Sequence, residues 1–92
     1  MAIESTYIAE KYGITPTAAY TKIVKFYVEN NNGLDKIILF TNTFYDQNAR
    51  TNLKEPIGIN DFQMTWFDGF TFADLYDFLK TQPEFVGAID VI

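Results

Sequence analysis

Cysteine and histidine are absent from the 92-residue sequence, and Ser5 is its only serine. The lack of cysteine excludes disulfides and thiolate nucleophiles. The lack of histidine removes the commonest general base at neutral pH and nearly all zinc chemistry. A serine hydrolase triad is excluded as well, because no histidine is present to activate Ser5. Cysteine nucleophiles and histidine bases are therefore ruled out, and we predict that the protein is not an enzyme.

The carboxylates that remain form no recognisable catalytic or metal-binding pattern. Asp46, Asn48 and Arg50 follow the spacing of a calcium-binding loop, but the arginine replaces an oxygen ligand. Asp74 and Asp77 lie near the expected start of a helix, where negative charge is stabilised by the helix dipole. The glycines have turn explanations and form no phosphate-binding motif. We predict neither a metal site nor a cofactor site.

Basic residues are scarce: seven lysines and arginines stand against twelve acidic residues, which gives a net charge of −5. Residues 61–92 hold six acidic side chains and a single basic one, Lys80. An acidic chain repels phosphate backbones, so we expect no binding to nucleic acid. No apolar run approaches the ~20 residues of a membrane span, and the N-terminus lacks the features of a signal peptide. We expect a protein that is made in the cytoplasm and binds no membrane.

Apolar and aromatic side chains, in contrast, are plentiful. Hydrophobic residues make up 48% and charged residues 21% of the chain, as in ordinary folded proteins. At this length we expect a single domain over residues 1–92. Nine Phe, six Tyr and one Trp make the aromatic content 17%, more bulk than one small core encloses. Some aromatics should therefore lie at the surface, where they are enriched at protein interfaces.

The chain is organised around residues 19–45, in which two β-prone runs flank a polar turn at residues 30–33. Alternation in the first run puts these side chains on one face: Tyr20, Lys22, Val24, Phe26 and Val28. Its other face holds Thr21, Ile23, Lys25, Tyr27 and Glu29. The second run carries two sets, Ile38, Phe40 and Phe44 on one face and Ile37, Leu39 and Tyr45 on the other. Apolar side chains on both faces indicate a strand covered from both sides, or a face that a partner covers.

Residues 59–67 alternate in the same way and predict a third strand that turns Phe62, Met64 and Trp66 toward the core. Trp66 could instead form a sugar platform or a binding hot spot, but its period with Phe62 and Met64 favours burial. The polar segment 46–58 predicts an exposed loop with one helical turn, and its length makes it a candidate contact region.

A C-terminal helix is predicted to begin after Thr71, because Thr71 and Asp74 have the spacing of a capping box and apolar residues follow at helical spacing. Residues 85–92 predict a last strand, parallel to the first or third. Residues 5–12 predict a short N-terminal helix, although an edge strand over residues 3–8 fits equally well. Together these patterns predict an α+β fold: a mainly antiparallel sheet of three to four strands built on the central hairpin, with the C-terminal helix packed on one face.

Several short sequence motifs occur together in a characteristic order. They are YGIT at 12–15, AYTKI at 19–23, YD at 45–46, AR at 49–50, LKTQPEF at 79–85 and GAIDV at 87–91. This ordering resembles a family of small proteins encoded among the tail and other late structural genes of tailed bacteriophages. The resemblance implies a virion component or assembly factor, of a tail, baseplate or fibre attachment, and such parts usually form symmetric rings. It also implies synthesis in the host cytoplasm and a final location in the virion.

We therefore predict a non-catalytic structural or interaction protein of a bacteriophage particle, which forms homo-oligomers or docks on other virion proteins. The expected contact residues on the hairpin and the following loop are Tyr27, Ile37, Leu39, Tyr45 and Arg50. A rival hypothesis is a small acidic inhibitor of a host defence or nucleic-acid enzyme, working through the acidic C-terminal third. Catalysis, a third hypothesis, would need a concave acidic pocket of which the sequence gives no sign.

Overall fold

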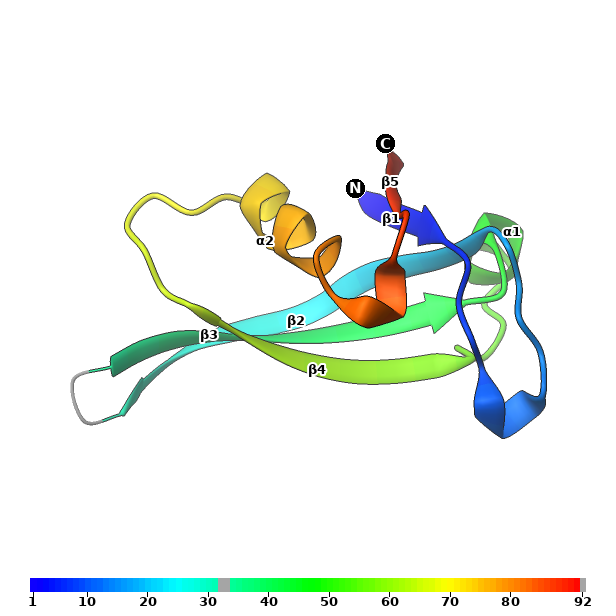
Figure 1. The fold of residues 1–92 in the computed structure, drawn as a ribbon, viewed down its shortest axis with the longest axis horizontal. Helices are drawn as coiled ribbons and strands as arrows, with labels where there is room; N and C mark the ends of the chain where they lie inside the picture. Colours follow the sequence, from blue (N-terminus) through cyan, green and yellow to red (C-terminus); the bar gives the residue numbers. More distant parts are fainter. Residues whose placement is uncertain (32–33, 92) are drawn as a thin grey trace.

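The computed structural model describes residues 1–31 and 34–91, so the predicted turn residues Asn32 and Gly33 lie outside the described residues. The described chain is α+β and is built on one antiparallel five-stranded sheet with the order β4-β3-β2-β1-β5 (Figure 1). The elements in chain order are β1 Ala2–Ser5, the 3-10 helix η1 Glu10–Tyr12, β2 Ala19–Asn31, β3 Leu34–Phe44, α1 Gln47–Thr51, β4 Gly58–Thr65, α2 Phe72–Leu79, the 3-10 helix η2 Pro83–Phe85 and β5 Ile89–Val91. The sheet is therefore wider than the three to four strands that the sequence predicts.

The predicted N-terminal helix over residues 5–12 is wrong. The alternative, a strand, describes the start of the chain better, but β1 pairs with both β2 and β5 and so is an inner strand rather than an edge. Beyond β1 the backbone N–H of Tyr7 donates to the carbonyl oxygen of Pro16 at 3.1 Å, and this pairing holds the chain extended. Helical geometry is limited to η1, which ends at Gly13 in the left-handed conformation with φ of 65°.

β2 and β3 form the long hairpin, and their register contains one bulge. Ile23 pairs with Thr41 and Lys25 pairs with Phe40, so Val24 is an extra residue in β2. An extra residue reverses the alternation of side chains between the two faces. The predicted grouping of β2 side chains therefore holds on either side of Val24 but not across it.

Helix α2 begins where the capping box predicts. The Thr71 hydroxyl accepts a hydrogen bond from the backbone N–H of Asp74 at 3.3 Å, and the Asp74 carboxylate accepts one from the backbone N–H of Thr71 at 2.9 Å. Figure 1 shows α2 on one side of β2, β3 and β4, beside β1 and β5. The helix turns three buried side chains toward the sheet, Leu75, Tyr76 and Leu79.

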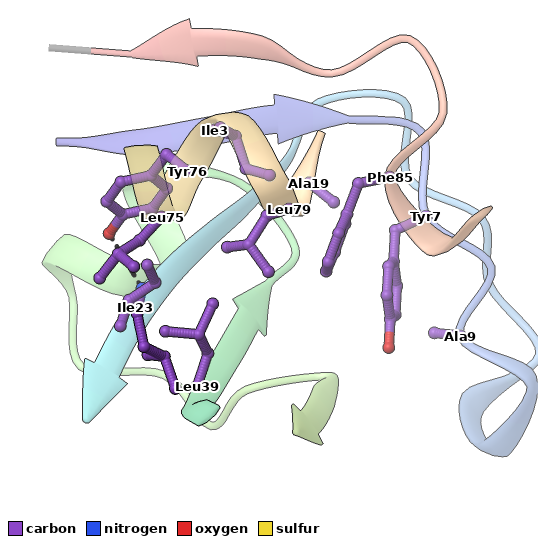
Figure 2. Close-up of a cluster of buried hydrophobic side chains, with 11 residues drawn as sticks. Ile3, Tyr7, Ala9, Ala19, Ile23, Leu39, Leu75, Tyr76, Leu79 and Phe85 are labelled. Carbon is purple, nitrogen blue, oxygen red and sulfur yellow. Dashed lines mark hydrogen bonds between the residues drawn. The ribbon is translucent and has the colours of Figure 1, made fainter. Parts of the chain in front are cut away.

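The core lies between α2 and the sheet, and Figure 2 shows most of its side chains. It consists of Ile3, Tyr7, Ala9, Ala19, Ile23, Ile37, Leu39, Leu75, Tyr76, Leu79 and Phe85. The rings of Tyr7 and Phe85 stack with their centroids 6.1 Å apart, which joins η2 to the segment after β1. Phe62, Met64 and Trp66 are partly buried against this core, on the side that the alternation of β4 predicts.

Strand β5 has an unexpected neighbour. It runs in the same direction as β2 and β4, as the crossover predicts, but it pairs antiparallel with β1 and touches neither of those strands in the sheet. The pairing aligns Ala2 with Val91 and Glu4 with Ile89. The sequence prediction made the N-terminus helical and so left β5 without β1 as a partner. The wrong neighbour predicted for β5 therefore follows from the wrong structure predicted for the N-terminus.

Candidate interaction face

The sheet has two unlike faces. The inner face packs against α2, and the outer face points away from it. Over β2, β3 and β4 the outer face consists of Tyr20, Lys22, Lys25, Tyr27, Glu29, Lys36, Ile38, Phe40, Asn42, Phe44, Ile59, Asp61, Gln63 and Thr65. Within residues 1–31 and 34–91, no helix lies over the centre of this face in Figure 1. The outer face is therefore the candidate interaction face.

Two of the predicted contact residues, Ile37 and Leu39, do not reach the outer face. Both side chains are 0% exposed and belong to the core beneath α2. Their prediction as outward-pointing residues is wrong, because α2 covers the set of β3 side chains that contains them. The other set, with Ile38 and Phe40, points outward instead.

Tyr27 does lie on the outer face, and it is 43% exposed. Its ring stacks on that of Phe40, with the centroids 5.9 Å apart and 26° between the ring planes. The Nζ atom of Lys25 lies 5.4 Å from the centroid of the Phe40 ring, within the range of a cation–π interaction. Ile38, the cross-strand partner of Tyr27, is only 4% exposed. We call Lys25, Tyr27, Ile38 and Phe40 the Tyr27 patch.

Tyr45 and Arg50 are exposed, but the structure does not bring them to the Tyr27 patch. Tyr45 follows Phe44, the last residue of β3, whereas Tyr27 pairs with Ile38. The six residues of β3 between these positions correspond to about 20 Å at roughly 3.3 Å per residue. The five predicted contact residues therefore divide into one on the Tyr27 patch, two in the core and two at the far end of the hairpin.

The predicted contact residues leave out three members of the Tyr27 patch, Lys25, Ile38 and Phe40. The signal that could have found them is the adjacent apolar pair Ile23 and Val24 between two lysines. Two neighbouring apolar residues interrupt strict alternation and are consistent with a bulge. With the bulge at Val24, Lys25 and Tyr27 fall on the same face as Phe40.

A hollow of about 470 Å³ lies away from the outer face, between the segment after β1 and η2. Its lining is mostly apolar and consists of Thr6, Tyr7, Ile8, Pro83, Glu84 and Val86. The hydroxyl of Tyr7 already accepts a hydrogen bond from Nδ2 of Asn60 at 3.0 Å. Glu84 is the one carboxylate among these lining residues.

Several of the acidic side chains have structural roles. The Asp46 carboxylate accepts a hydrogen bond from the backbone N–H of Ala49 at 2.7 Å and so caps α1. Lys80 Nζ lies 3.0 Å from Asp77 and 3.1 Å from Asp90. Its hydrogen bond to Asp77, and to a smaller extent its hydrogen bond to Asp90, raises the pKa of Lys80. Among the residues that the structure describes, no three acidic side chains gather as a metal site would require.

Comparison of the chain with protein families, with curated proteins and with solved structures found no match. Across the described ranges, no helix has the length and apolar character needed to cross a membrane. The function must therefore be inferred from the surfaces of this chain.

Proposed function

We propose that this chain is a non-catalytic structural protein of a bacteriophage particle and that it docks on a neighbouring virion protein through the Tyr27 patch. One observation carries the proposal: the five-stranded sheet has its main helix on one face, and the other face exposes a stacked aromatic pair. The sequence resemblance to phage tail and late structural proteins supports the particle as the location.

The Tyr27 patch has the physical character of a protein contact. Tyr27 offers a large ring with a polar hydroxyl, a combination that is enriched among the residues that dominate binding energies. Its stack on Phe40 holds the ring in place before binding, so little side-chain entropy remains to be lost. Ile38, the cross-strand partner of Tyr27, adds a buried apolar side chain to the patch.

The charge of the outer face indicates the chemistry of the partner. Over β2, β3 and β4, Lys22, Lys25 and Lys36 stand against Glu29 and Asp61, a balance of +1 in a chain whose net charge is −5. The outer face is thus less acidic than the rest of the molecule. It suits a partner surface with carboxylates around an apolar centre, because complementary charge steers association and fixes its orientation.

The rival function, inhibition of a basic enzyme through the acidic C-terminal third, is less well supported. Lys80 lies between Asp77 and Asp90 and partly neutralises both. Asp74 is engaged in the cap of α2 with Thr71. Carboxylates that already have partners within the chain offer less to a basic enzyme than free ones.

Incorporation into particles tests the proposal. A tagged copy of the chain is expressed while the encoding phage is propagated, and purified particles are analysed by quantitative mass spectrometry. We expect a fixed number of copies per particle. Tyr27→Ala should reduce that number about tenfold, which corresponds to about 1.4 kcal/mol of lost contact energy.

Tyr12→Ala is the matched control, because Tyr12 is also exposed and also has a lysine over its ring, with Lys11 Nζ 5.7 Å from the centroid. This variant should enter particles like the wild type. Absence of the wild-type chain from particles would overturn the function, and normal incorporation of Tyr27→Ala would overturn the docking surface.

A further inference from the structure

We propose that the free edge of β4 pairs with β4 of a second copy of this chain, antiparallel and around a two-fold axis at Phe62. The two sheets then form one continuous sheet. This contact uses the edge of the sheet and not its outer face, so it goes beyond the docking function proposed above.

β4 and β5 form the two edges of the sheet, and only β5 has an obvious protection against further pairing. Edge strands are commonly protected by shortness, proline, lysine or a bulge. β5 has three residues, whereas β4 has eight. β4 contains no proline and no lysine, and its register with β3 is unbroken from Gly58 to Thr65. Its edge is therefore open to another strand.

The hydrogen bonds of β4 define which backbone groups are free. The N–H of Trp66, just after β4, donates to the carbonyl oxygen of Asp35 at 3.2 Å. Met64 pairs with Ile37 in the same register, so the even-numbered residues of β4 bond to β3. The N–H and C=O groups of the odd-numbered residues point to the free edge, and these residues are Ile59, Asp61, Gln63 and Thr65.

The side chains distinguish three of the two-fold registers that these groups allow, with axes at Asp61, Phe62 and Gln63. An axis at Asp61 sets two carboxylates directly opposite each other, which is destabilising. An axis at Gln63 aligns only residues 61–65. An axis at Phe62 aligns residues 59–65 in four hydrogen-bonded pairs, or about eight hydrogen bonds. It also sets Asp61 opposite Gln63 of the second copy, whose amide group can donate to the carboxylate.

The inner side of the same edge favours the axis at Phe62. In this register Phe62 lies directly opposite Phe62 of the second copy. The two residues form a non-hydrogen-bonded pair, the kind of pair in which opposing side chains are closest. Phe62 is only partly buried in the single chain, and a cross-strand aromatic pair stabilises a sheet. A hollow of about 320 Å³ lies at the C-terminal end of β4, where it is lined by Gln63, Met64 and Thr65 together with Lys36 and Phe78. A second strand would lie along this hollow.

Gln63→Pro tests the edge. Proline at this position removes an N–H that points away from β3, so the bonds between β3 and β4 remain. Gln63→Thr is the matched control, because threonine keeps the N–H and suits a strand. In sedimentation equilibrium at up to about 1 mM, we expect the wild type and Gln63→Thr to dimerise, and Gln63→Pro to dimerise at least tenfold more weakly. A wild type that is monomeric at this concentration, or a folded Gln63→Pro that dimerises like the wild type, would overturn the proposal.

Disulfide trapping tests the register without a proline. The chain has no cysteine, so single-cysteine variants report defined contacts. In the proposed register residues 61 and 63 of different copies form a pair about 5.5 Å apart at Cα, within disulfide range, whereas the two residues 61 are roughly 7–8 Å apart. Mild oxidation of a mixture of Asp61→Cys and Gln63→Cys should give mainly the mixed dimer. Equal amounts of mixed dimer and of either homodimer would refute the register.

The two proposals fail separately. Tyr27→Ala changes the outer face and should leave self-association unchanged, because Tyr27 is on β2 and not on the edge. If the wild type stays monomeric but enters particles in a Tyr27-dependent way, edge pairing is refuted and docking stands. If it dimerises but never enters particles, the reverse holds.

Discussion

The phenolic oxygen of Tyr76 accepts a hydrogen bond from the backbone N–H of Ile23 at 2.9 Å. Tyr76 is on α2 and Ile23 immediately precedes the bulge residue Val24 in β2, so this bond ties the helix to the irregular point of the hairpin. Figure 2 shows the two side chains together in the core. The bond thus connects the element that covers the sheet with the feature that decides which face is covered.

Tyr76→Phe should destabilise the fold by about 1–3 kcal/mol, because it leaves a buried N–H without a partner. Chemical unfolding followed by circular dichroism measures the change. Tyr12→Phe is the control, since Tyr12 is half-exposed, and it should stay within about 0.5 kcal/mol of the wild type. Equal stabilities for Tyr76→Phe and the wild type would show that the hydrogen bond contributes nothing to folding.

Stability should fall at alkaline pH, in part through Tyr76. Burial raises the pKa of Tyr76 above its ordinary value of 10.0, although the hydrogen bond from Ile23 acts in the opposite direction. A raised pKa means that the folded state holds the proton more tightly than the unfolded state does. The stabilisation is therefore complete below pH 10 and is lost as the pH rises through the folded-state pKa of Tyr76. Melting temperatures between about pH 9 and pH 11 should decline less steeply for Tyr76→Phe than for the wild type.

Gly58→Ala should destabilise the protein by about 1–3 kcal/mol. A Cβ atom at position 58 would overlap the phenol of Tyr7, and that ring is held by its stack on Phe85 and its hydrogen bond from Asn60. A double-mutant cycle with Tyr7→Ala measures the effect. The cost of Gly58→Ala should largely disappear when Tyr7 is already alanine, and an unchanged cost would place its origin in the backbone.

Deletion of Val24 should be tolerated, with a cost of about 1 kcal/mol, the usual size of a point change. The deletion removes the extra residue, so Ile23 stays on the inner face and Lys25 on the outer face in a regular ladder. Deletion of Thr41, in the middle of β3, is the control and should unfold the chain, because it moves one part of β3 to the wrong face. Unfolding of the Val24 deletion would mean that the bulge is required for stability.

The positions of β2, β3, β4 and α2 followed from local patterns. The alternation of Phe62, Met64 and Trp66 predicted their side of β4, and the spacing of Thr71 and Asp74 predicted the start of α2. These signals act over a few residues and need no knowledge of the rest of the chain. The N-terminus was different, because β1 is a strand only through its pairing with β2 and β5, which are distant in sequence.

The candidate site was predicted only in part for the same reason. Tyr27 is exposed on the outer face, but the predicted partners Ile37 and Leu39 are core residues. Both faces of β3 carry apolar side chains, so the sequence pattern did not indicate which face α2 would cover. One extra residue, Val24, then decided which β2 side chains accompany each face.

The sequence by itself determined the absence of cysteine and histidine, the acidity of the C-terminal third, the hairpin and the capped helix, because composition and short-range periodicity are properties of neighbouring residues. Tertiary structure alone decided that β1 is an inner strand, that β4 is a free edge and that Tyr27 stacks on Phe40 in the open. Those outcomes depend on pairing between distant segments and on the side of the sheet that α2 buries.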